Sequence, residues 1–149
     1  VLGERTDFAG VTLNKTVGRH GSAQVLAKYG AVLGEVCGIV FQHPQEKTLY
    51  LAGDTVWYEE VAATLERHRP EVIIVNCGDA RLLGDQPIIM NEQDLLALAA
   101  AAPRATIMAS HLEAVNHASV TRARLRAVLA EHGLSDRVLV PADGETIVC

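Results

Sequence analysis

An apolar stretch that stops on a carboxylate places the strongest constraint on how this chain can fold. Residues 48–55 read T-L-Y-L-A-G-D-T, so Asp54 comes directly after a strand-like run. Two histidines end comparable stretches, His111 after residues 105–110 and His20 after a Val- and Thr-rich stretch. Open α/β sheets bind their ligands outside the carboxyl ends of the strands. We therefore expect these three side chains to meet at one edge of a sheet.

One aspartate and two histidines from separate strand ends form a donor set suited to a divalent metal. Each residue also has an ordinary structural interpretation, because an aspartate in a turn often caps a helix and a lone histidine often lies hydrogen-bonded in a core. The segment after His111 favours function, since Glu113, Asn116 and His117 share its strand-to-helix loop. Such loops carry function more often than cores do. The sequence therefore predicts a metal site.

Composition limits the class of protein. The chain has 149 residues, of which 49% are apolar and 21% charged, so we expect a packed core rather than disorder. That length is typical of one domain, and residues 1–149 are expected to form a single one. The three cysteines, Cys37, Cys77 and Cys149, show no paired spacing, which is typical of a reduced cytoplasmic protein.

Charge and hydropathy argue against two classes of partner. The net charge is -5 and the basic residues are scattered, with no basic stripe interleaved with aromatics, so nucleic acid is not an expected partner. No apolar run approaches the length of a membrane span, so no membrane partner is expected either. Neither nucleic acid nor a membrane is therefore an expected partner.

Strand-like and helix-like segments alternate along the chain, which predicts an α/β fold with helices packed on a face of the sheet. Apolar and alternating runs predict strands at residues 11–16, 35–42, 49–53, 71–77, 105–110, 138–140 and 146–148, with residues 1–7 as a further strand or its turn. Helical spacing predicts helices at residues 23–29, 56–69, 91–102 and 119–131.

Residues that start or stop helices agree with these boundaries. Thr55, Asn91 and Ser119 have short polar side chains of the kind that cap helix N-termini, so each is expected to be an N-cap. Gly30 and Gly133 are expected to close two of the helices, because glycine readily adopts the left-handed conformation found there.

Several segments, taken in order, resemble the metallo-β-lactamase superfamily and its lactonase-like branch. They are T-V-G-R-H-G-S around His20, Y-L-A-G-D-T around Asp54, M-A-S-H-L-E-A-V-N-H around His111, and the intervening and closing stretches P-E-V-I-I-V-N-C-G and V-P-A-D-G-E. The resemblance covers nearly the whole chain. It implies a four-layer αββα sandwich with a metal site at one edge. It also implies a metal-dependent hydrolase of a small ester, lactone or phosphorylated substrate.

The His-x-His-x-Asp-His motif of the family's first half is absent, so the resemblance identifies the chain as the second half of that fold. It implies that His20 and His111 are metal ligands and that Asp54 bridges two cations, with Asp54 and His111 at the catalytic centre. The implied metal is zinc, with manganese as the alternative. We expect the first half to lie elsewhere: in the rest of the same protein, in a separate chain, or in a symmetric homo-oligomer.

Residues near the expected ligands have two interpretations each. Glu113, Asn116 and His117 either support the ligands and contact substrate, or cap the helix that follows. Arg81, in the loop after residues 71–77, either binds a carboxylate or phosphate of the substrate or lies on the surface.

Two other functions are compatible with the same residues. The chain could be a truncated, non-catalytic α/β module that binds a partner chain. It could also be a nucleotide-binding domain with residues 78–84 as its phosphate loop. However, G-D-A-R-L-L-G lacks both G-x-G-x-x-G and the Lys-Ser/Thr ending of a P-loop. We favour the metal-dependent hydrolase.

Overall fold

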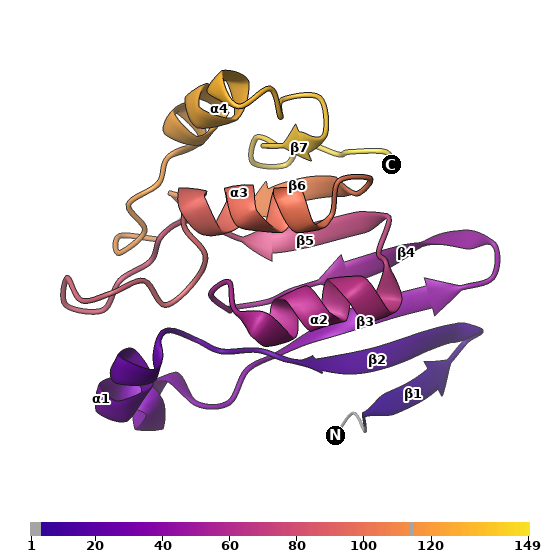
Figure 1. Ribbon diagram of the computed structural model, residues 1–149, viewed down its shortest axis with the longest axis horizontal. Helices are drawn as coiled ribbons and strands as arrows, with labels where there is room; N and C mark the ends of the chain where they lie inside the picture. Colours follow the sequence, from indigo (N-terminus) through magenta and orange to yellow (C-terminus); the bar gives the residue numbers. More distant parts are fainter. Residues whose placement is uncertain (1–3, 114) are drawn as a thin grey trace.

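The computed structural model describes residues 4–113 and 115–149, and shows a seven-stranded sheet whose strands follow chain order (Figure 1). The strands are β1 (Arg5–Phe8), β2 (Val11–Val17), β3 (Cys37–His43), β4 (Glu46–Leu51), β5 (Val72–Asn76), β6 (Thr106–Ser110) and β7 (Val138–Leu139). The helices are α1 (Ala23–Leu33), α2 (Glu59–His68), α3 (Glu92–Ala101) and α4 (Arg122–Glu131). The predicted mixed α/β class is confirmed.

Strand direction decides where the loops lie. Strands β1 to β4 pair antiparallel, whereas β4 to β7 pair parallel. Because β2 and β4 are both antiparallel to β3, they run in the same direction as each other. The carboxyl ends of β2, β4, β5 and β6 therefore lie along one side of the sheet, called the ligand edge below. In Figure 1 this edge is on the left, where the loops after β5 and β6 also lie.

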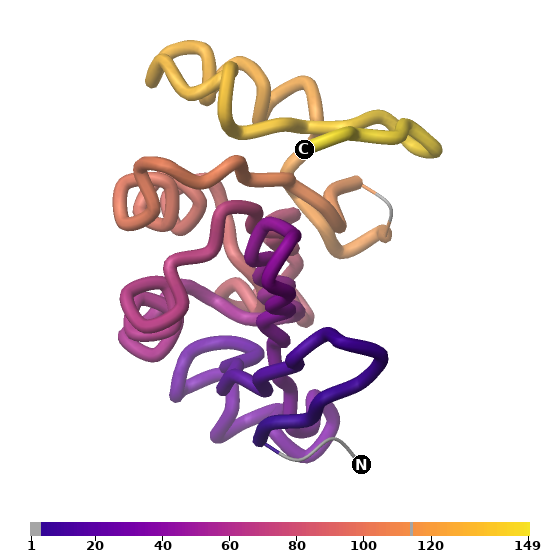
Figure 2. Tube along the Cα trace, turned by 90° about the vertical axis from the view of Figure 1, so that its right-hand side faces the viewer, coloured from indigo at the N-terminus to yellow at the C-terminus, as the bar shows by residue number. Residues whose placement is uncertain are grey.

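Helices α2, α3 and α4 lie on one side of the sheet, as the two perpendicular views show (Figures 1 and 2). Parallel neighbours need a crossover connection, and α2 and α3 provide it between β4, β5 and β6. The sheet face beneath these helices is called the covered face. The opposite one is the open face.

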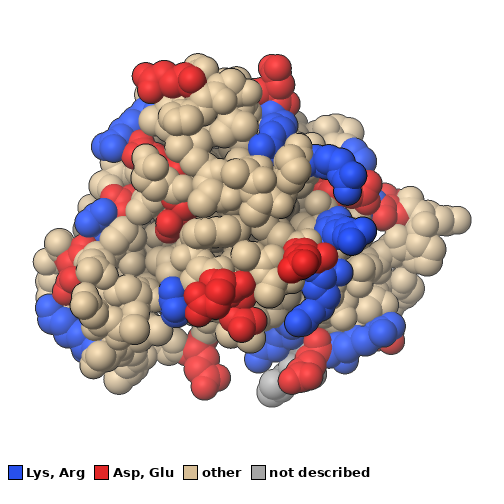
Figure 3. All heavy atoms as spheres, viewed as in Figure 1, with Lys and Arg blue, Asp and Glu red and all other residues tan. Residues whose placement is uncertain are grey.

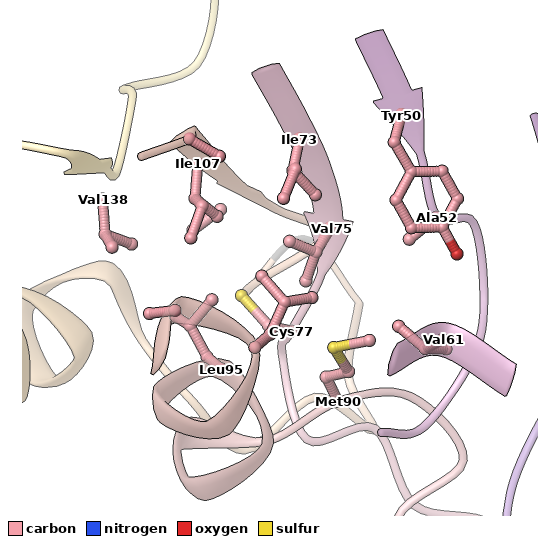
Figure 4. Close-up of a cluster of buried hydrophobic side chains, with 14 of the residues drawn as sticks. Tyr50, Ala52, Val61, Ile73, Val75, Cys77, Met90, Leu95, Ile107 and Val138 are labelled. Atoms are coloured by element: carbon pink, nitrogen blue, oxygen red, sulfur yellow. The ribbon is translucent and has the colours of Figure 1, made fainter. Parts of the chain in front are cut away.

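The core lies between the covered face and the helices. Val40, Tyr50, Ile73, Ile107 and Val138 stand opposite one another across five strands, and each is 2% exposed or less. Apolar residues of the three helices pack against them, namely Val61, Leu65, Leu95, Leu98, Leu125 and Leu129. Figure 4 shows the part of this cluster around β5. Each buried side chain of this size contributes about 1.5–3 kcal/mol.

The open face carries a second apolar row with much less cover. Ile39, Leu51, Ile74, Met108 and Leu139 stand opposite one another on it, and none of them is buried. The described residues thus provide one sheet and one helical layer of the four-layer sandwich implied by the resemblance.

Two helix boundaries differ from the prediction. The expectation that Gly30 closes the first helix is wrong, since α1 continues to Leu33 and Gly34 supplies the positive φ of +67°. The expectation that Thr55 caps the second helix is also wrong, because α2 starts at Glu59. The Thr55 hydroxyl instead accepts the N–H of Arg19 and donates to a backbone carbonyl.

In the C-terminal part, one predicted N-cap is confirmed, and two predicted element boundaries are wrong. The Asn91 side chain accepts the N–H of Asp94 at the start of α3. Ser119 is not the cap of α4, which starts at Arg122 with Thr121 as its N-cap. The expected strand at residues 146–148 does not form. Val148 there is 94% exposed and Ile147 only half-buried, so the segment buries little apolar surface that would hold it to the sheet.

The described N-terminal strand β1 covers only part of the residues 1–7 expected there, and residues 1–3 lie outside the described residues. None of the described helices has the length and hydropathy needed to cross a membrane.

Acidic and basic side chains are interspersed on the helix-covered face (Figure 3). On this face Arg124 of α4 makes two contacts of 2.6 and 2.7 Å with the Glu92 carboxylate of α3.

The position of Gly30 gives a first testable prediction. A Cβ there would meet nothing closer than 4.0 Å, and the residue lies inside α1. Gly30→Ala should therefore stabilise the protein by about 0.5–1 kcal/mol, because alanine loses less backbone entropy in a helix. The matched control Gly34→Ala should destabilise it, because the left-handed conformation costs alanine about 1–2 kcal/mol. Urea unfolding measures both, and equal effects of the two changes would contradict these helix boundaries.

Candidate metal centre

His20 and Asp54 lie side by side at the ligand edge. The loop after β2 is joined to the loop after β4 by two hydrogen bonds: the Arg19 N–H donates to Thr55 Oγ1 at 3.0 Å, and the Val56 N–H donates to the Arg19 carbonyl at 2.9 Å. His20 Nε2 then lies 4.0 Å from Asp54 Oδ2. That separation is too long for a direct hydrogen bond, so neither group satisfies the other.

The Asp54 side chain has a fixed partner on its other oxygen. Asn76 Nδ2, at the end of β5, donates to Asp54 Oδ1 at 2.7 Å. The preceding Gly53 has a φ of +70°, and a Cβ there would lie 2.8 Å from the carbonyl oxygen of Cys37. The turn that places Asp54 at the edge therefore requires glycine at position 53.

His111 follows β6 at the same edge and has an unusual backbone. Its φ is +52°, a left-handed conformation that is strained for a residue with a Cβ. Its carbonyl oxygen packs so closely on Gly78 that a Cβ at position 78 would lie 2.2 Å from it. Such strain persists only where surrounding contacts hold it, and it is common at functional sites.

The structure brings two of the three predicted ligands together and places the third at the same edge. Within residues 4–113 and 115–149, no group of three or more His, Cys, Asp or Glu side chains is arranged to hold a metal ion. The roles of His20, Asp54 and His111 as ligands therefore stay a prediction.

The donor set fits a divalent cation as part of a site. His20 Nδ1 is buried and has no hydrogen-bond partner, and a buried polar atom of this kind is costly to leave unpaired. Its ring lies beside a carboxylate with one oxygen still open to a further partner. Imidazole nitrogen and carboxylate oxygen are the ligands that zinc and similar metals take.

A buried carboxylate holds the loops after β5 and β6 together. Asp79 is 8% exposed and contacts the Arg81 guanidinium at 3.0–3.1 Å. It also accepts the hydroxyl of Ser119. The Arg81 N–H donates to the His117 carbonyl at 3.0 Å, and the Ser119 N–H donates to the Gly78 carbonyl at 2.9 Å. Together, these contacts support the loop that carries His111.

The other predicted site residues have local partners. The Arg81 guanidinium, expected to bind an anion of the substrate, contacts Asp79 instead. Glu113 accepts the N–H of Arg122 at 2.9 Å, at the first residue of α4. His117 Nδ1 lies 3.3 Å from Asn116 Oδ1, and both side chains are exposed. Glu113 thus accepts one backbone N–H at the start of α4, whose N-cap is Thr121. Any contact of these four residues with substrate stays a prediction.

Two pKa shifts near the edge follow from these positions. Burial raises the pKa of the Cys77 thiol to about 12, so it stays protonated at neutral pH and packs as a core residue. Hydrogen bonds from backbone N–H groups, first its own and then that of Arg122, hold the pKa of the exposed Glu113 carboxyl below its usual value. Glu113 is therefore ionised where it meets α4.

Asn76 was missed by sequence reasoning, although a signal for it exists. It ends the apolar run V-I-I-V-N of β5, just as Asp54 and His111 follow the runs of β4 and β6. The rule that polar residues ending parallel strands share one edge applies to it equally. Its amide was overlooked because amides are less common metal ligands than imidazoles and carboxylates.

The chain is similar in sequence to known proteins that are longer than it is. No family model matches the chain. The chain is 44% identical to the UPF0173 protein YddR of Bacillus subtilis over 146 residues, which are 98% of the chain and 56% of YddR. Further relatives are named UPF0173 metal-dependent hydrolases. The chain thus spans little more than half the length of YddR.

Solved structures agree with this relationship. An isothiocyanate hydrolase from Delia radicum gut bacteria superposes with a TM-score of 0.95 at 45% identity, over 99% of this chain and 58% of that one. The metallo-beta-lactamase fold protein YhfI from Bacillus subtilis has a TM-score of 0.66 at 13% identity, over 95% of this chain and 50% of that one. The second likeness shows the fold alone, and it confirms the predicted fold family.

The contact between Gly78 and His111 gives a second prediction. Gly78→Ala should displace the His111 carbonyl and destabilise the protein by about 1–3 kcal/mol, as overpacking usually does. The imidazole NMR signals of His111 should move with it. The control Gly84→Ala, where a Cβ would meet nothing within 4 Å but the φ of +75° strains alanine, should destabilise the protein and yet leave those signals in place. Unchanged His111 signals in Gly78→Ala would contradict the described packing.

Proposed function

Because this chain belongs to the UPF0173 metal-dependent hydrolase family, we propose that its ligand edge is part of a site that hydrolyses a small molecule with a divalent cation. The supporting observation is the Asp54 carboxylate, which lies between the Asn76 amide and the His20 imidazole at the edge where β6 delivers His111. The chain spans little more than half of its relatives' length, so the activity belongs to the assembled protein.

The chain would contribute His20, Asp54 and His111 to the cation, with zinc as the proposed metal and manganese as the alternative. Catalytic zinc sites usually have three protein ligands for each ion. The remaining ligands would come from the part of the fold that this chain does not span. The open face, with Leu51 36% and Val17 62% exposed, offers that part an apolar surface to pack on.

The bound cation would supply Lewis acidity and make water nucleophilic near neutral pH. The residues of the chain fix the geometry around it. Asn76 directs one oxygen of Asp54 and leaves the other facing His20. The strained backbone of His111 and its contact with Gly78 set where the third ligand enters the site.

The charges of the site favour a neutral substrate. Arg81 is paired with Asp79, and the Arg19 guanidinium stacks 4.2 Å from the ring centre of Tyr58 with Glu59 at 3.9 Å. The Arg81 guanidinium is therefore occupied by Asp79, whereas that of Arg19 lies against Tyr58 with its Nε unpaired among the described residues. Within the predicted range of esters, lactones and phosphorylated compounds, this arrangement supports neutral esters and lactones.

Isothiocyanates are a further neutral class that we propose as substrates, because the 45% identical structure is an isothiocyanate hydrolase. Addition of one water to R–N=C=S forms a C–O bond at the central carbon. Cleavage of the C–N bond, with both protons of the water passing to nitrogen, leaves an amine and carbonyl sulfide. The alternative proposal, a non-catalytic module that binds a partner chain, requires the same open face but no cation.

Reconstitution tests the proposed function. The chain is co-expressed with the part of YddR that it does not match, and cation content and amine release from an isothiocyanate are measured. We expect a complex that holds divalent cation and is active, whereas Asp54→Ala should lower kcat/KM at least about 100-fold, as loss of a group that stabilises the transition state does. The control Asp7→Ala removes an exposed carboxylate of β1 and should have no effect.

Two results would count against this proposal. Full activity of the complex after complete removal of metal would exclude the metal-dependent mechanism. A stable complex that holds no cation and hydrolyses nothing would favour the non-catalytic module.

The substrate class has its own prediction. A panel of one isothiocyanate, one lactone and one phosphate monoester is assayed with the same complex. We expect the neutral compounds to have kcat/KM values at least about 10-fold above that of the phosphate monoester, since a missing charge partner costs more than about 1.4 kcal/mol. A phosphate monoester that is hydrolysed fastest would contradict the argument from the pairing of Arg81 with Asp79.

A further inference from the structure

Asn76 occupies a position in the sheet that only the tertiary structure reveals. It is the last residue of β5 and stands opposite Ser110 of β6. The residue before it, Val75, is fully buried on the covered face, so the alternation of the strand places Asn76 on the open face. The Asn76 side chain therefore lies at the ligand edge, between the loops that carry Asp54 and His111.

The hydrogen bond from Asn76 to Asp54 joins two rigid segments. Asn76 Nδ2 donates to Asp54 Oδ1 at 2.7 Å, across 22 residues of sequence. The Ala52 N–H donates to the Ile74 carbonyl at 2.9 Å, which continues the pairing of β4 with β5 beyond the last strand residue. The donor thus extends from paired backbone, and the acceptor lies only two residues beyond Ala52, the last residue of this segment bonded to β5.

The kind of donor matters as much as its position. An amide N–H is neutral, whereas an arginine or lysine in its place would compensate the charge of Asp54 and compete with a cation for it. The amide occupies Oδ1 and leaves Oδ2 facing His20, with Nε2 at 4.0 Å. The carboxylate is therefore oriented without losing its negative charge.

We propose that Asn76 is a positioning residue that orients the Asp54 carboxylate for the divalent cation. This inference rests on the proposed metal centre. It assigns to Asn76 no contact with substrate. Its effect passes through Asp54, and it should appear first in the affinity for the cation.

A matched set of variants tests this role in the reconstituted protein. Removal of a hydrogen-bond partner of a metal ligand typically lowers metal affinity about 10–100-fold. We expect a decrease of that size in the Zn²⁺ and Mn²⁺ affinity of Asn76→Ala, measured by competition with a chromophoric chelator. Asn76→Leu should show the same decrease, because leucine restores most of the volume and not the donor.

Asn14 provides the control for a purely structural hydrogen bond. Asn14 Nδ2 of β2 donates to Gln42 Oε1 at 2.9 Å and is similarly half-buried. Asn14→Ala should leave the cation affinity unchanged, whatever it does to the free energy of unfolding. At saturating cation, the KM of the Asn76 variants should match that of the unmodified protein.

The outcomes separate this inference from the proposed function. Cation affinities of Asn76→Ala and Asn76→Leu equal to that of the unmodified protein would overturn the role of Asn76 and leave the metal centre intact. An equal loss in Asn14→Ala would show that the effect is only structural, which also overturns it. An unmodified protein that forms no complex or binds no cation would overturn the proposed function itself.

Discussion

The direction of four strands is the constraint on which the candidate site depends. Strands β2, β4, β5 and β6 all end at one edge because an antiparallel strand, β3, separates β2 from β4 and the following strands pair parallel. This arrangement brings His20, Asp54, Asn76 and His111 to one edge of the sheet although they are spread over more than half of the chain. A reversal of any one of these strands would move its polar residue to the opposite edge.

Much of this arrangement could be predicted because it depends on local patterns. An apolar run followed by a polar residue predicts both a buried strand and the group presented at its end, and the strands before Asp54 and His111 formed as expected. Asn91 caps α3 as expected, because the N–H that its side chain accepts belongs to Asp94, only three residues further along the chain. Features that depend on residues close together in the chain could therefore be predicted from the sequence.

The expectations that failed concern side chains with distant partners. Thr55 and Ser119 have the chemistry of N-caps, but the backbone of Arg19 and the carboxylate of Asp79 use their hydroxyl groups instead. Arg81 likewise has the character of an anion-binding residue. Its partner is Asp79, two positions earlier, whose positive φ is not evident from the sequence. Asn76 was missed for the same reason, because the sequence does not indicate which distant carboxylate its amide contacts.

The two faces of the sheet differ in how substitutions on them affect the packing of the protein. The buried row around Tyr50 and Ile73 packs against helices and loops of this same chain, whereas the row around Leu51 and Ile74 has no such cover among the described residues. The packed core and the uncovered apolar row are therefore on opposite sides of one sheet. A substitution in the open row therefore leaves this interior packed as it is, whereas one in the buried row does not.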